Sequence, residues 1–175
     1  MTKENLHENV EIREYRDSDY ETCRSLWVEL AQYHQEIYKF PVPDKDPGKG
    51  FDDYLNTETR RGTWVAEIKG KVVGLAGLLV NSEVFSEVEP IIVSQQYRGR
   101  GIGGLLMKKV VGEAGKTGCV YLSIRPGARN KASMTAFVRL GFDHVWTVEL
   151  IRELKPGPGL KWLPGLKIHD NELGY

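Results

Sequence analysis

The stretch Gln96–Gly104 combines four glycines with two arginines, and these residue types suit the binding of a phosphate group. It follows a β-branched run, Ile91–Val93, and it precedes apolar residues at helical spacing that begin at Ile102. Glycine lets the backbone approach a ligand closely, and the first N–H groups of a helix have no partner inside the helix. The helix dipole adds partial positive charge there, and Arg98 and Arg100 add full charges. We therefore interpret this stretch as an anion-binding turn between a strand and a helix.

A dinucleotide-binding turn is one alternative. The spacing Gly99-x-Gly101-x-x-Gly104 matches its glycine pattern, but the full fingerprint also needs an acidic residue about 20 residues later, at the end of the next strand. The next predicted strand, Cys119–Ile124, contains no carboxylate. The dinucleotide interpretation is therefore disfavoured.

A P-loop is the other alternative, because Gly115-Lys116-Thr117 resembles the end of that motif. However, the pattern needs a glycine where this chain has Val110, and the tripeptide follows a predicted helix instead of opening one. We interpret it as a helix stop, with Gly115 or Gly118 as the left-handed cap.

Three motifs, in order and at fitting spacing over about residues 64 to 150, together resemble the GNAT N-acetyltransferase superfamily. Gln96-x-x-Gly99-x-Gly101 resembles its acetyl-coenzyme A signature, and Glu89–Val93 occupies the place of its fourth strand. Asn130–Ser133 and Leu140–Phe142 match its later helix and the Gly-Phe ending. The resemblance implies an acetyl-CoA-dependent N-acetyltransferase that joins an acetyl group to a primary amine of a small molecule or peptide by direct attack in a ternary complex.

The resemblance also implies roles for individual residues. The N–H groups of the glycine turn would hold the pyrophosphate, and the pantetheine arm would lie along the strand before it like an added strand, with backbone N–H groups binding the thioester oxygen. Two residues of the later motif would help to hold the pantetheine. The residues expected to bind the cofactor are Ile91, Ile92, Val93, Arg98, Gly99, Arg100, Gly101, Ile102, Gly103, Gly104, Asn130 and Ser133.

Glu89 is the expected general base, because it matches a carboxylate that some relatives are thought to use. A free amine is almost wholly protonated at neutral pH, so a proton acceptor is needed. The alternatives are that Glu89 only neutralises a nearby cation, or that Glu87 is the base. The chain departs from the family at Phe137, where many relatives have a tyrosine proposed to protonate the departing thiolate. Tyr97 and Tyr121 are alternative donors, and the departure favours a second interpretation, a non-catalytic acyl-CoA-binding module.

Composition limits the other classes of function. The 175 residues carry 24 basic and 24 acidic side chains, and a net charge of zero argues against nucleic-acid binding. No apolar run has the length of a membrane span, the first ten residues lack a signal-peptide core, and two cysteines and four scattered histidines suggest no metal site. We therefore expect a cytoplasmic protein with no membrane partner, no metal and no disulfide.

Charge is distributed unevenly along the chain. Residues 17 to 58 hold ten acidic and four basic side chains, whereas residues 97 to 139 hold nine basic and one acidic. A polyanionic cofactor on the basic segment and a cationic acceptor near the acidic one would suit this asymmetry, and solvated surfaces are the alternative for the acidic one. Tyr33, His34, Tyr38 and Phe40 stand where the family's acceptor site usually lies, although ordinary packing would also explain them.

The pattern of apolar residues and turns predicts an α/β (α+β mixed) fold. Its sheet is mixed, mostly antiparallel, of six to seven strands, with helices on both faces. One domain is expected over residues 1–155, and residues 156–175 form an extension that packs on this domain or on the partner subunit of a homodimer. The expected elements are strands at Val10–Tyr15, Trp64–Ile68, Lys71–Val80, Phe85–Val93, Cys119–Ile124 and Phe142–Leu154, and helices around Leu26, at Phe51–Thr59, after Gly101 and at Lys131–Leu140.

Overall fold

The computed structural model describes residues 10–39, 45–154 and 162–175. The chain forms two compact units, Met1–Leu30 with Asp46–Ile124 and Ala31–Lys45 with Arg125–Tyr175. The predicted boundary at residue 156 lies outside the described residues.

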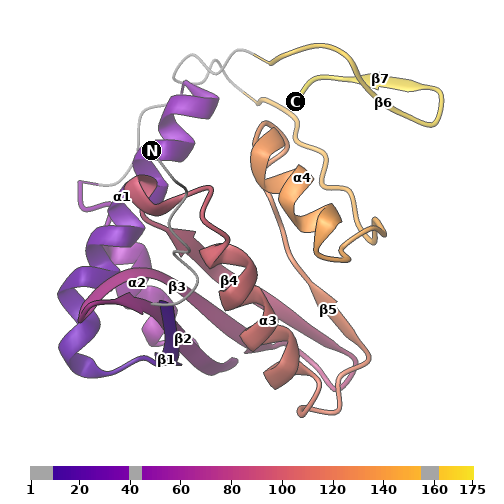
Figure 1. Ribbon diagram of the computed structural model, residues 1–175. Coiled ribbons are helices and arrows are strands. Elements are labelled where there is room, and N and C mark those ends of the chain that lie inside the picture. The colour runs from indigo at the N-terminus through magenta and orange to yellow at the C-terminus, as the bar shows by residue number, and fades with distance from the viewer. Residues whose placement is uncertain (1–9, 40–44, 155–161) are drawn as a thin grey trace. The chain divides into compact units, whose positions relative to one another are not determined.

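A five-stranded sheet is the centre of the first unit (Figure 1). Its strands are ordered β1-β2-β3-β4-β5 as in the sequence; the first four run antiparallel, and β5 runs parallel to β4. The strands expected at Trp64–Ile68 and Lys71–Val80 are confirmed, and they form a hairpin around Lys69-Gly70. The bounds are β1 Val10–Glu14, β2 Arg60–Ile68, β3 Lys71–Val80, β4 Phe85–Val93 and β5 Tyr121–Ser123.

Helices cover both faces of this sheet. On one face, the first part of α1 (Tyr20–Tyr38) and α2 (Lys49–Leu55) pack a core against alternate strand residues such as Leu75. The other face is covered by α3 (Ile102–Ala114). The evidence is Gly74, the neighbour of Leu75: a Cβ on Gly74 would lie 3.3 Å from Leu106 of that helix. Successive strand residues point to opposite faces, so the two layers lie on opposite sides of the sheet. The mixed sheet with two helical layers is therefore confirmed.

The start of α1 is fixed by a buried carboxylate. Asp19 ends a short 3-10 helix, η2 (Asp17–Asp19), and is 6% exposed. Arg13 of β1 donates to both of its oxygens, at 2.7 and 2.9 Å, and the Arg16 backbone N–H donates at 2.8 Å. The hydrogen bonds from Arg13 are the main cause that lowers the pKa of Asp19. This ion pair thus joins the residue before α1 to strand β1 of the sheet.

The second unit contains α4 (Lys131–Arg139) and a separate hairpin of β6 (Leu166–Ile168) and β7 (Asn171–Leu173). The helix predicted at Lys131–Leu140 is confirmed. In the first unit, Gly118 has φ +83°, whereas Gly115 caps α3 with φ −59°, so Gly118 is the left-handed residue of the two candidates.

The predicted long strand at Phe142–Leu154 is wrong, because no strand forms over those residues. Apolar residues stand next to each other in this segment, and the members of each pair are exposed: Val145 84% and Trp146 75%, Leu150 71% and Ile151 74%. A strand needs a partner edge far away in the sequence, and an apolar pattern alone does not supply one. Among the described residues, the main sheet therefore has five strands, with two more in the separate hairpin.

Candidate cofactor site at the end of strand β4

The glycine turn joins β4 to α3 through a single 3-10 turn, η3 (Gln95–Tyr97). Gly99 has φ +74° and Gly101 has φ +81°, so both adopt the left-handed conformation that glycine reaches without strain. Gly101 is the N-cap of α3 and provides no side-chain hydrogen bond to its first N–H groups. The N-terminus of a 13-residue helix therefore begins at this turn, and its N-cap residue offers no side-chain acceptor to the first amides.

The glycines inside the first turn of α3 have no packing reason to be glycine. A Cβ on Gly104 would meet nothing within 4 Å, and one on Gly103 would touch only Val93 Cγ2 at an ordinary 3.8 Å. Glycine inside a helix costs about 0.5–1 kcal/mol relative to alanine. Since the protein itself leaves room for a methyl group, this space is suited to a molecule that approaches the backbone from outside.

Among the described residues, no strand pairs with the part of β4 next to the turn on the side away from β3, and we call this part the open edge. The ladder between β4 and β5 covers only Phe85 to Glu87 of β4 in the described chain. On the other edge, the Ser94 N–H donates to Val73 O of β3 at 2.9 Å. Backbone groups alternate in direction along a strand, so those of Ile92 face β3, whereas those of Ile91 and Val93 face away from it. Val93 O confirms the direction, because it accepts from Arg98 Nε at 2.9 Å.

Glu89 lies where β4 bulges. The register with β3 shifts between Ala76/Ile91 and Leu78/Val88, so Glu89 and Pro90 stand together opposite Gly77. Gly77 is required there: a Cβ would lie 2.0 Å from Tyr54 Oη and 2.5 Å from the Glu89 carbonyl oxygen. The bulge thus places Glu89 just beyond the last pairing of β4 with β5.

Glu87, the other candidate base, has a different environment. It is 4% exposed, it pairs with Ser123 of β5, and its Oε2 accepts from Asn81 Nδ2 at 3.1 Å. It belongs to the paired part of the sheet, not to the open edge.

Cationic groups surround the turn. Arg100 donates to Gln96 O at 3.0 Å, and its guanidinium lies 5.2 Å from the centre of the Tyr97 ring. Lys71 Nζ lies 5.9 Å from the same ring. The arginines at 98 and 100 are exposed, so this end of α3 combines positive side chains with the positive end of the helix dipole.

In the second unit, Asn130 is the N-cap of α4. It is 5% exposed, its Oδ1 accepts from the Ser133 N–H at 3.1 Å, and the Tyr33 hydroxyl donates to the same oxygen at 3.3 Å. Asn130 therefore has a structural role in this unit. Phe137 packs against Phe142 with ring centres 6.3 Å apart.

The expected acceptor residues Tyr33, His34 and Tyr38 lie on the last part of α1, in the second unit, and Phe40 lies outside the described residues. His34 is half-buried, and burial lowers the pKa of its imidazole, which favours the neutral form. Tyr38 Oη accepts from the Arg129 N–H at 3.3 Å, and the Arg129 guanidinium lies 5.1 Å from the Tyr38 ring.

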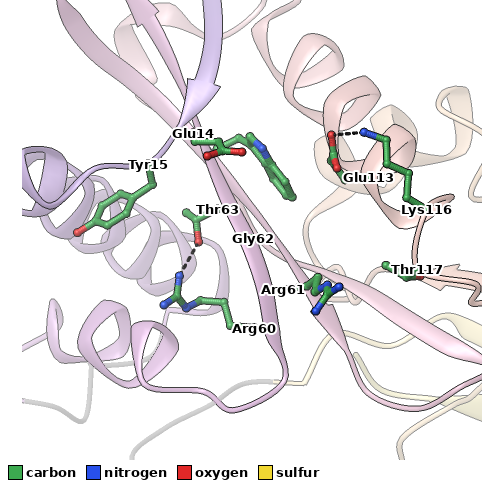
Figure 2. Close-up of a pocket in the computed structure, with 10 residues that line it drawn as sticks. Glu14, Tyr15, Arg60, Arg61, Gly62, Thr63, Glu113, Lys116 and Thr117 are labelled. Atoms are coloured by element: carbon green, nitrogen blue, oxygen red, sulfur yellow. Dashed lines mark hydrogen bonds and ion pairs between the residues drawn. The ribbon is translucent and has the colours of Figure 1, made fainter.

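A cavity of about 430 Å³ lies elsewhere in the first unit, between the start of β2 and the last part of α3 (Figure 2). Its polar groups already contact one another: Lys116 pairs with Glu113 at 2.9 Å, and Arg60 approaches the Thr63 hydroxyl at 3.5 Å. Trp64 also lines the cavity, but its Nε1 is buried from solvent and has no hydrogen-bond partner among the residues that the structure describes. We assign no ligand to this cavity, because its charged groups largely compensate one another and a molecule in it would not reach that N–H.

A family model for the acetyltransferase (GNAT) family matches residues 27–142 of the chain, about two thirds of its length. The chain belongs to the GNAT family. An uncharacterized N-acetyltransferase of Methanocaldococcus jannaschii is 26% identical over 145 residues, which cover 79% of this chain. Those residues are 63% of the relative, so this chain spans less than two thirds of that protein's length.

Solved structures share the fold at low sequence identity. An aminoglycoside N-acetyltransferase in complex with the bisubstrate analog CoA-S-monomethyl-acetylneamine superimposes with a TM-score of 0.61 and 21% identity, covering 82% of this chain and 97% of that one. A ribosomal-protein-alanine N-acetyltransferase of Brucella melitensis gives a TM-score of 0.64 at 16% identity, covering 82% and 99%. These similarities show a GNAT fold.

One residue near the turn was not predicted from the sequence. The carboxylate of Glu29, on α1, accepts from the Ser94 hydroxyl at 3.1 Å and from the Gln95 N–H at 3.0 Å. It lies outside the three motifs quoted in the sequence analysis, and an isolated glutamate on a helix gives no signal that it reaches a turn far along the chain.

Among the residues described, no group of three or more histidine, cysteine, aspartate or glutamate side chains is arranged to hold a metal ion. Within the same ranges, none of the helices combines the length and the apolar character needed to cross a membrane.

Proposed function

We propose that this chain is an acetyl-CoA-dependent N-acetyltransferase that transfers an acetyl group to a primary amine in a ternary complex. The observation that carries the proposal is the open edge of β4 leading directly into the uncapped N-terminus of α3. A single extended molecule with a pyrophosphate at one end and amide groups along its length suits both features. Membership of the GNAT family supports the same conclusion.

The residues of this chain fit coenzyme A. Gly99 and Gly101 adopt left-handed conformations, Gly103 and Gly104 leave space beside the helix backbone, and the amides there would bind the pyrophosphate together with Arg98, Arg100 and Ile102. The outward backbone groups of Ile91 and Val93 would pair with the pantetheine arm, while Ile92, 2% exposed, supports the strand from the core. Asn130 and Ser133 are proposed as further pantetheine contacts. Acetyl-CoA, when bound, supplies the activated acetyl group.

Glu89 is the proposed proton acceptor for the amine. It stands in the bulge next to the open edge, whereas Glu87 is held in the paired part of the sheet by Asn81. A carboxylate at this position would take the proton directly or through a water molecule. The proton that the departing thiolate needs would come from water or from Tyr97, since Tyr121 packs on Phe85 in the ladder with ring centres 5.2 Å apart. Free thiols have a pKa of about 8.5, so water suffices.

The acceptor is proposed to be a small-molecule or peptide amine with positive charge. The acidic segment at residues 17 to 58 favours a cationic acceptor. The two solved relatives act on different classes, an aminoglycoside and a ribosomal-protein alanine, at nearly equal structural similarity. The fold alone therefore does not select between a small molecule and a peptide. A homodimer, a cytoplasmic location and packing of residues 156–175 on the domain or its partner complete the proposal.

A non-catalytic acyl-CoA-binding module is the second candidate. Phe137 favours it, because this residue has no proton to give and packs on Phe142. The two candidates share the cofactor site and differ in turnover.

Two experiments test the proposal. Thermal-shift measurements with acetyl-CoA, CoA, NAD and ATP should show stabilisation by the two CoA compounds, because a ligand that binds the native state raises its stability. A screen of polyamines, amino acids, aminoglycosides and peptide N-termini for CoA release should then identify the acceptor. In that assay Glu89→Gln should lower turnover by about 10²-fold with CoA affinity unchanged, while Glu87→Gln should not. Binding of acetyl-CoA without CoA release in the presence of any tested amine would select the non-catalytic module. Stabilisation by NAD or ATP alone would refute both candidate functions.

A further inference from the structure

Glu29 is the described side chain that ties α1 to the start of the glycine turn. Its two carboxylate oxygens accept separate hydrogen bonds, from the Ser94 hydroxyl at 3.1 Å and the Gln95 N–H at 3.0 Å. Ser94 is the N-cap of η3, and no side-chain hydrogen bond from within that segment caps the 3-10 turn. Glu29 therefore supplies, from a different element, the cap that the turn lacks.

The turn is also held by Arg98, which donates to Val93 O, and by Arg100, which donates to Gln96 O, but its residues are mostly at the surface. Gln95, Gln96, Arg98, Gly99, Arg100 and Gly101 are all exposed. Two of these residues are glycines in left-handed conformations, and glycine loses more conformational freedom on ordering than any other residue. The hydrogen bonds of Ser94 and Gln95 to Glu29 fix the direction in which the chain leaves β4 and enters the turn, and hence the direction of the amides that follow.

We propose that Glu29 is a positioning residue for the cofactor turn, holding Ser94 and Gln95 so that the amides at the start of α3 are ordered before coenzyme A binds. The inference rests on the proposed cofactor site and names a residue outside the three motifs of the sequence analysis. A turn that is already ordered binds its ligand more tightly, because the ordering cost has been met in folding.

The negative charge of Glu29 should lower the affinity for CoA, whereas its positioning of the turn should raise it. A carboxylate near an anion site repels the anion, so a purely electrostatic role predicts tighter CoA binding when Glu29 is neutralised. A positioning role predicts weaker binding when the acceptor oxygens are removed. The two effects therefore differ in sign.

The test is calorimetric measurement of CoA binding to four variants of the full chain. Glu29→Ala should raise the Kd for CoA about tenfold. Glu29→Gln keeps one acceptor oxygen and should change this Kd by less than about threefold. Ser94→Ala should raise the Kd by an intermediate factor. The double variant Glu29→Ala/Ser94→Ala should bind no more weakly than Glu29→Ala, because the two residues share one interaction. Glu21→Ala is the matched control, since it removes the same charge from an exposed position of the same helix and should leave the Kd unchanged.

Turnover gives a second readout once an acceptor is known: Glu29→Ala should raise KM for acetyl-CoA and leave kcat and the acceptor KM unchanged. Tighter CoA binding by both Glu29 variants, or an unchanged Kd in Glu29→Ala and Ser94→Ala, would overturn the inference. These outcomes differ from failure of the proposed function, in which the unmodified protein itself does not bind CoA. If Glu29→Ala does not fold, Glu29→Gln and Ser94→Ala still decide the outcome.

Discussion

Replacing Gly103 with alanine should change stability and cofactor binding in opposite directions. Gly103 lies in the first turn of α3, and a methyl group there would contact only Val93 Cγ2, at 3.8 Å. The free protein therefore accepts the methyl group, and the lower entropy of the unfolded chain should raise the free energy of unfolding by about 0.5 kcal/mol, the lower end of the range for glycine in a helix. For a chain of this size that corresponds to an increase in Tm of about 1–2 °C.

CoA binding should weaken at the same time, because the methyl group would stand between the helix amides and the pyrophosphate. We expect at least about a tenfold increase in the Kd for CoA, equivalent to about 1.4 kcal/mol. The matched control is Gly112→Ala in the same helix, where a Cβ meets nothing within 4 Å. The control should gain similar stability and keep its CoA affinity.

The assay pairs thermal unfolding without ligand with calorimetric titration of CoA. Equal CoA affinities in Gly103→Ala, Gly112→Ala and the unmodified protein would contradict this prediction, because the open space beside Gly103 would then have no connection with a ligand. A loss of both stability and affinity would mean that the glycine is needed for folding instead.

Two further predictions concern stability. Asp19→Asn should lower the free energy of unfolding by about 2–3 kcal/mol at pH 7, since it breaks a bidentate ion pair with Arg13 at a position only 6% exposed. Because the pKa of Asp19 is lowered from 3.8 in the folded state, the extra stability of the unmodified protein over Asp19→Asn is complete above about pH 4 and should disappear as the pH falls through the folded pKa. Urea unfolding at several pH values measures this difference, with Asp17→Asn as the exposed control, and a difference that stays constant at low pH would contradict the prediction. Gly77→Ala should cost about 2–4 kcal/mol, because its Cβ would lie 2.0 Å from Tyr54 Oη and would displace that hydroxyl from Thr63 Oγ1, 2.7 Å away. Urea unfolding beside Gly112→Ala measures this loss, and equal stability of the two variants would show that the bulge accommodates the methyl group.

Local patterns in the sequence were sufficient to predict most elements of the first unit. The strand Phe85–Val93 and the helix that follows Gly101 form where the β-branched run and the helical spacing place them. These features depend on neighbours within a few residues, such as glycines that adopt positive φ and apolar residues that share a helix face. For the same reason the residue types and spacing of the glycine turn were enough to predict a candidate anion site.

Tertiary structure decided the features that depend on partners far away in the sequence. The segment Phe142–Leu154 has apolar residues suited to a strand but forms none, because pairing requires an available edge. The edge of β4 is open only after Glu87, and this depends on where β5 ends and on the bulge opposite Gly77. Glu29 reaches Ser94 and Gln95 only because α1 packs beside the end of β4. The sequence alone therefore determined the local conformations and the chemical character of the turn. Long-range packing determined where the pairing of β4 with β5 ends and which side chain of α1 contacts the turn, because those contacts exist only after the chain has folded.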